Sequence, residues 1–194
     1  MDIRKHLHDY AIDVAQRVIK SDFDILSAIV QRLVQVKTGE KTIYTAGNGG
    51  SASTASHVCN DLVKGCRVNG REGFRAVCLS DSNAIVTCLA NDFSYEDIFS
   101  IQLKTFAVKD DVLIVFSGSG NSPNIISALK TAREMGVFTI GFSGRDGGKM
   151  KDFCDLLLIA PTDSMEQIED MHLLYEHAMI CSIKEQLTMN NEQL

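Results

Sequence analysis

Apolar side chains recur every three or four positions through the first 36 residues. One such series starts at Leu7 and a second starts at Ile25. This spacing is typical of amphipathic helices, so it predicts two of them in succession. Ser21 and Asp22 lie between the two series and offer short oxygen-bearing side chains that can cap the second helix. We therefore expect a helical N-terminal extension over residues 1–36.

From Lys41 onward the pattern changes to short apolar runs separated by helical stretches. Most of these runs are apolar throughout, as in strands that are buried on both faces of a parallel sheet. The alternation predicts one α/β domain, residues 1–194, with a doubly wound, mainly parallel five-stranded sheet flanked by helices. The predicted strands are Thr42–Ala46, Phe74–Leu79, Val112–Phe116, Val137–Phe142 and Leu156–Ala160. The predicted helices are Ser51–Lys64, Ser82–Ala90, Tyr95–Val108, Pro123–Met135 and Ser164–Gln186.

Two loops rich in Gly, Ser and Asn follow the first and third predicted strands, at residues 47–53 and 117–122. Glycine lets the backbone approach a ligand, and a helix N-terminus behind each loop offers unpaired N–H groups to a phosphate. Ligands of open α/β sheets bind at the carboxyl ends of the strands, so both loops can face one site. Neither loop carries the P-loop or the G-x-G-x-x-G pattern. We expect a phosphorylated small molecule in a cleft, although the second loop could be an ordinary tight turn.

Composition narrows the functional classes. A net charge of −6 over 194 residues argues against non-specific nucleic-acid binding. No apolar stretch approaches the roughly 20 residues that span a membrane, and the first residues lack the apolar centre of a signal peptide. The six cysteines form no C-x-x-C pair, so we expect reduced structural thiols in a cytoplasmic protein.

Two groups of histidines and carboxylates are candidates for chemistry. His57 and Asp61 are four apart on the helix predicted after the first loop, so they share a face. Such a pair can bind a metal, act as acid and base, or simply be solvated. The last predicted helix carries His172 and His177 among apolar residues and several carboxylates.

Together these motifs resemble the phosphoheptose isomerase family of the sugar-isomerase (SIS) domain superfamily. The resemblance starts at Gly47–Ala52 with His57 downstream and covers nearly the whole chain. The other matching segments are Asn91–Phe93, Ser117–Ser122, Ala132–Val137, Gly144–Lys149 and the pair His172 and His177.

The resemblance implies an enzyme that interconverts sedoheptulose 7-phosphate and D-glycero-D-manno-heptose 7-phosphate for surface polysaccharide, working as a homotetramer with one zinc ion per site. It implies that Asp61 is the catalytic base and His177 its acid/base partner. The implied zinc ligands are His57, Asp61, Glu169 and His177. The implied substrate-binding residues are Asn48, Gly49, Gly50, Ser51, Asp61, Asn91, Asp92, Ser117, Gly118, Ser119, Asn121, Ser122 and Glu169, with the serine loop at the phosphate.

Three positions depart from the family pattern. Asp61 stands where the family has Glu, Glu169 where it has Gln, and Gly118 where it has Thr. In addition, Glu169 and His177 are eight residues apart, about 12 Å along a straight helix. Either that helix bends or different subunits supply the two ligands, which favours an oligomer with shared sites.

Two other hypotheses remain open on the sequence. The chain can be an isomerase of a different sugar phosphate, or a non-catalytic SIS protein that serves as an oligomeric platform for a protein partner.

Overall fold

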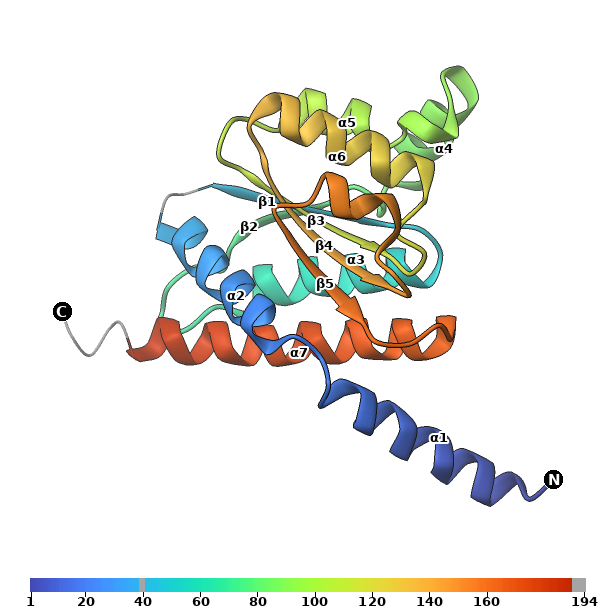
Figure 1. Ribbon diagram of the computed structural model, residues 1–194. Helices are drawn as coiled ribbons and strands as arrows, with labels where there is room; N and C mark the ends of the chain where they lie inside the picture. The colour runs from blue at the N-terminus through green and yellow to red at the C-terminus, as the bar shows by residue number, and fades with distance from the viewer. Residues whose placement is uncertain (39–40, 190–194) are drawn as a thin grey trace.

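The chain begins with two helices, as the sequence predicts. In the computed structural model, which describes residues 1–38 and 41–189, they are α1 (Ile3–Val18) and α2 (Phe23–Thr38). The carboxylate of Asp22 accepts hydrogen bonds from the backbone N–H groups of Asp24 and Ile25, at 3.1 and 3.0 Å. Asp22 therefore caps α2, and α1 points away from the body of the molecule (Figure 1).

The described residues form a five-stranded sheet in which every neighbouring pair of strands is parallel. The strand order β2-β1-β3-β4-β5 confirms the predicted doubly wound fold. The strands are β1 (Thr42–Gly47), β2 (Arg75–Cys78), β3 (Val112–Ser117), β4 (Phe138–Gly144) and β5 (Leu156–Ala160).

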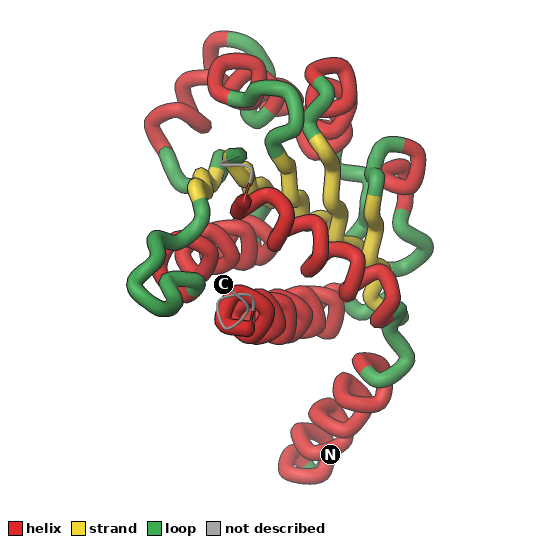
Figure 2. The backbone as a smooth tube through the Cα atoms, turned by 90° about the vertical axis from the view of Figure 1, so that its left-hand side faces the viewer, coloured by secondary structure: helices red, strands yellow, loops and turns green. Residues whose placement is uncertain are grey.

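Helices cover both faces of the sheet (Figures 1 and 2). The helices after α2 are α3 (Gly50–Asn60), η1 (Asp61–Gly65), α4 (Asn83–Asp92), η2 (Tyr95–Asp97), α5 (Ser100–Phe106), α6 (Pro123–Met135), η3 (Gly148–Asp152) and α7 (Met165–Met189). Each face has its own apolar core: Ile43 and Ile114 face α2, α3 and α7, whereas Tyr44 and Leu113 face α5 and α6. This alternation of neighbouring residues between two buried layers explains why the central strands are apolar throughout.

Three elements differ from the prediction. The helix expected over residues 95–108 is divided into the 3-10 turn η2 and the short helix α5. The helix expected over residues 51–64 becomes a π-helix, η1, from Asp61 onward. The strand β2 is not buried on both faces, because it lies at the edge of the sheet, where Val77 is 44% exposed.

The strand order places the two glycine- and serine-rich loops side by side. Strands β1 and β3 are neighbours, yet the helix after β1, α3, covers one face of the sheet, and the helix after β3, α6, covers the other. The winding therefore reverses between these two strands, and such a switch point opens a crevice at the carboxyl ends of the strands. Both loops border it, as the sequence predicts.

Within the described residues, no helix has both the length and the apolar character to span a membrane. All six cysteines are free thiols. Burial raises the pKa of Cys154 to about 12 and that of Cys59 to about 11, which keeps these thiols protonated and unreactive.

Candidate active site

The first loop is tied to the first turn of α6 by a pair of side-chain amides at the switch point. The side chain of Asn48 donates to Oδ1 of Asn124 at 2.9 Å and accepts from Nδ2 of Asn124 at 2.8 Å. Oδ1 of Asn48 also accepts a hydrogen bond from the hydroxyl of Tyr95, at 2.9 Å. The side chain of Asn48 is therefore largely occupied within the protein, and its role is to hold the loop at the start of α6.

The second loop brings short hydroxyl groups together in front of α6. The hydroxyls of Ser117 and Ser122 are 3.2 Å apart. Asn121 braces the loop, because its Oδ1 accepts from the backbone N–H of Lys149 at 3.1 Å and its Nδ2 donates to the carbonyl of Ser119 at 2.8 Å. The loop thus presents hydroxyls and a helix N-terminus without a cation, a combination suited to an anion.

Gly118, at the position where the resemblance implies Thr, faces the side chain of Met165. A Cβ atom on Gly118 would lie 2.5 Å from the sulfur of Met165. Met165 therefore fills the space that a side chain in the middle of the serine loop would need.

Four side chains from two helices converge beside the crevice. His57 and Asp61 come from α3 and the start of η1, and Glu176 and His177 come from α7. One ligand atom from each lies within 4.8 Å of the others. The Nε2 atom of His57 is 3.1 Å from Nε2 of His177 and 3.7 Å from Oδ2 of Asp61. The structure thus unites three of the four residues that the resemblance implies as zinc ligands, and we call these four residues the His/carboxylate cluster.

Glu176 is the member of this cluster that the sequence analysis missed. Its side chain is 0% exposed, and its Oε2 lies 3.3 Å from Nε2 of His177. Burial, and then the negative charge of Asp61, raise the pKa of Glu176 to about 7. A signal was available: the core-facing positions of α7 include His172, Met179 and Ile180, and Glu176 falls in the same stripe. A carboxylate in a largely apolar stripe is a candidate functional group.

Glu169, the fourth implied ligand, is not in the His/carboxylate cluster. Its carboxylate lies against the start of α3, because a Cβ atom on Gly50 would be 2.3 Å from Oε2 of Glu169. Gly50 therefore leaves room for this carboxylate at a helix N-terminus, where the helix dipole favours a negative charge. The helix α7 continues unbroken through Glu169 and Glu176.

Asn91 and Asp92 lie at the end of α4 and are exposed. Their side chains bond to each other at 2.8 Å, and Asp92 also accepts from the thiol of Cys88 on the same helix at 3.4 Å. The structure does not bring them into the His/carboxylate cluster. The nearby Tyr95 connects this part of the chain to the first loop.

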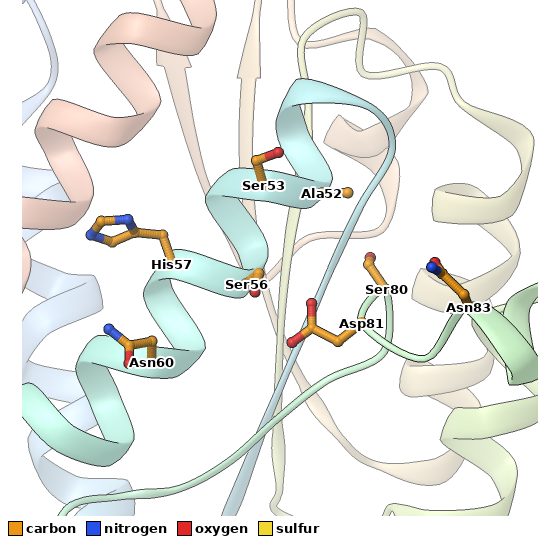
Figure 3. Close-up of a pocket in the computed structure, with 8 residues that line it drawn as sticks. All are labelled: Ala52, Ser53, Ser56, His57, Asn60, Ser80, Asp81 and Asn83. Carbon is orange, nitrogen blue, oxygen red and sulfur yellow. The ribbon is translucent and has the colours of Figure 1, made fainter.

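An open pocket of about 580 Å³ lies next to His57, between α3 and the segment that follows β2. Figure 3 shows Ser80, Asp81 and Asn83 on one side of the pocket and residues of α3 on the other. The ring of His57 lies at the rim and points away from Asp81, toward α7 (Figure 3).

His172, which the sequence placed beside His177 as a candidate, belongs to the core. It is 1% exposed, packs against the rings of Phe116 and Phe142, and its Nε2 donates to the carbonyl of Ser143 at 3.1 Å. Burial lowers the pKa of His172 to about 4, so the ring is neutral at pH 7.

Comparison with known proteins identifies the family of the chain. Residues 6–144 match the SIS domain family. A phosphoheptose isomerase from Aliarcobacter butzleri is 43% identical over 148 residues, which cover 76% of this chain and 77% of the relative. The chain belongs to the phosphoheptose isomerase family. A second family member, from Clostridium acetobutylicum, is 35% identical over 177 residues, covering 90% of this chain and 89% of that protein.

A solved phosphoheptose isomerase from Neisseria gonorrhoeae has the same fold. It superimposes with a TM-score of 0.86 at 31% identity, covering 94% of this chain and 97% of the other. The agreement extends from the N-terminal helices to α7, so both helices that carry the His/carboxylate cluster belong to the shared fold.

Proposed function

We propose that this enzyme is an aldose–ketose isomerase that interconverts sedoheptulose 7-phosphate and D-glycero-D-manno-heptose 7-phosphate. The observation that carries the proposal is the convergence of His57, Asp61 and His177 at the side of the switch-point crevice. The family relatives support the substrate class, because they are phosphoheptose isomerases with extensive coverage of this chain. A non-catalytic platform would not need titratable groups gathered in this way.

The phosphate end of the sugar belongs at the second loop. Ser117, Ser119 and Ser122 supply hydroxyls there, and α6 directs its N-terminus at the same place. The carbonyl end of the sugar then belongs at the His/carboxylate cluster, and we assign Asn91, Asp92 and Glu169 to the hydroxyl groups between.

The cluster fits a divalent zinc ion. Imidazole nitrogens and carboxylate oxygens are ordinary zinc ligands, and here they gather within 4.8 Å around a buried carboxylate. His57, Asp61 and His177 would hold the ion. When bound, zinc would act as a Lewis acid toward the sugar oxygens at C1 and C2.

The reaction is a 1,2-proton shift through an enediol, and two side chains are placed to move the protons. Asp61 directs Oδ2 toward His57, whereas its Oδ1 accepts from the side chain of Asn60 at 3.1 Å. We assign the removal of the carbon-bound proton to this carboxylate. We assign His177, whose Nε2 faces the cluster, as the acid/base partner at the substrate oxygen.

We further propose a cytoplasmic homotetramer that makes heptose precursors of surface polysaccharide. Support for self-association comes from α1, where Leu7 is 65% exposed and Ile19 is 75% exposed. Large apolar side chains on a projecting helix are typical of an association surface.

Proton NMR of the zinc-loaded protein with sedoheptulose 7-phosphate in D2O tests the reaction. We expect a new anomeric signal and deuterium at C2 of the product. Absence of both exchange and product, with zinc present, would refute the proposed activity.

A substitution tests the role of Asp61. Asp61→Asn removes the base while preserving size, so turnover should fall by about 100- to 10,000-fold. Asp163→Asn, at an exposed position before α7, is the matched control and should turn over like the parent. Near-normal turnover by Asp61→Asn would show that another group takes the proton.

A further inference from the structure

The side chain of Glu176 is buried, which is energetically costly for an ionised carboxylate that has no cation beside it. Its side chain is fully buried, and neither oxygen accepts a hydrogen bond from any residue in the part of the chain that the structure describes. The Nε2 atoms of His177 and His57 lie 3.3 and 4.0 Å from Oε2. A buried carboxylate without such partners is destabilising, so its position calls for a compensating positive charge.

We propose that Glu176 is a direct ligand of the metal, so that His57, Asp61, Glu176 and His177 supply four ligands from one chain and a sugar oxygen can enter as a fifth. This inference rests on the proposed function, which places a divalent metal at the cluster. Ligand atoms about 2.0–2.2 Å from a tetrahedral zinc ion lie roughly 3.3–3.6 Å from one another. Four of the six separations among these side chains are 3.1, 3.3, 3.7 and 4.0 Å, and all six are within 4.8 Å, so a small contraction around an ion would reach that value.

The same geometry keeps Glu169 away from this metal. The helices α3 and α7 lie side by side, with Gly50 next to Glu169 and His57 next to His177. Both helices therefore run in the same direction between these points. Over seven or eight residues each advances about 10–12 Å, so Glu169 is too far along α7 to join the cluster of its own chain.

Glu169 and His177 are eight residues apart on a continuous helix. With Glu176 as the fourth ligand in place of Glu169, α7 does not need to bend. Glu176 and His177 are adjacent in sequence, and their side chains meet those of His57 and Asp61, which are one turn apart on the facing helix. Two carboxylates and two neutral imidazoles also balance the charge of a divalent cation. The carboxylate of Glu169 is then free to act at the start of α3, beside the first loop.

Zinc affinity measured by competition with a chromophoric chelator tests this assignment without relying on turnover. Glu176→Gln removes the charge and preserves the shape, and we expect its zinc affinity to fall by about 100-fold or more, since even loss of a group behind the ligands costs 10–100-fold. Glu169→Gln is the matched control, because it makes the same change two turns away on the same helix, and its affinity should stay within about threefold of the parent. Glu176→Asp should fall between the parent and Glu176→Gln.

Cobalt(II) absorption adds a second readout, because losing a ligand changes the intensity of the metal-centred bands. Thermal unfolding of the metal-free proteins checks folding, and Glu176→Gln should unfold at a temperature no lower than the parent. The assignment is overturned if Glu176→Gln binds zinc like the parent, if Glu169→Gln loses as much affinity as Glu176→Gln, or if the parent binds no zinc. Sugar phosphate turnover, measured separately, decides the proposed function: an active parent with unchanged zinc affinity in Glu176→Gln refutes the ligand role alone.

Discussion

Two histidines five positions apart on α7 show how strongly the surroundings of a residue determine its chemistry. His177 is 53% exposed at its side chain and meets His57 across the facing helix. His172 lies in the core, between two phenylalanine rings and a backbone carbonyl. The first is therefore available to a metal or a proton, and the second is a neutral packing element.

The buried ring of His172 should make the protein sensitive to acid. Its pKa is about 4 in the folded state and 6.5 ordinarily, so the unfolded chain binds a proton that the folded chain does not as the pH falls from about 6.5 to 4. The free energy of unfolding should drop over this window, by roughly 3 kcal/mol at its lower end. Urea unfolding at pH 7 and pH 4.5 measures the change.

His172→Gln provides the comparison, because glutamine can still donate to the carbonyl of Ser143 but does not titrate. The loss of stability between pH 7 and pH 4.5 should be smaller in this variant. Other titrating groups, including Glu176 with its raised pKa, cancel in the difference between parent and variant. An equal loss in both proteins would show that His172 does not control the acid response.

At the scale of elements, the spacing of hydrophobic residues along the chain predicted the number and order of the strands and most of the helices. It located the two loops at one edge of the sheet, since both follow buried strands. It did not reveal the pairing of Asn48 with Asn124, because hydrogen bonds between residues 76 positions apart leave no periodic trace. It also missed Glu176, since one carboxylate in an apolar stripe does not alter the period of the helix.

The amide pair between Asn48 and Asn124 should control how well the two loops bind the substrate together. Asn124→Ala leaves Asn48 without its reciprocal partner, which should cost about 1–3 kcal/mol of stability and loosen the first loop. We expect KM for the sugar phosphate to rise more than kcat falls, measured by steady-state kinetics. Ser127→Ala, on the same helix, is the control, and equal KM values in the two variants would contradict a positioning role.

At the scale of the whole molecule, α1 carries large apolar side chains that the rest of the single chain does not cover. It contains no buried residue and extends from the body, held by contacts such as that between the hydroxyl of Tyr10 and Asp170 (Figures 1 and 2). Exposed Ile3 and Leu7 share one side of the helix, and exposed Ile12 and Ile19 share another. Sequence periodicity predicted this helix but not the exposure of its apolar side chains, because periodicity does not show which side of a helix the rest of the chain covers.

Leu7→Glu tests whether α1 joins copies of the chain. The side chain is 65% exposed, so a charge there should leave the fold of the single chain intact while disfavouring burial between subunits. Light scattering after size exclusion should show a smaller assembly than that of the parent. Lys5→Glu, at an exposed polar position on the same helix, should keep the parent's mass. A parent that is itself monomeric would refute the association.

The meeting of His57 with His177 joins residues 120 positions apart. A nascent chain therefore emerges from the ribosome with half of the His/carboxylate cluster long before the other half has been synthesised. The cluster is complete only when α7 docks beside α3, so binding of the proposed metal would belong to the last stage of folding. Once bound, the ion would cross-link α7 to α3 across a very long loop of the chain. It would therefore oppose the detachment of α7 from the rest of the molecule.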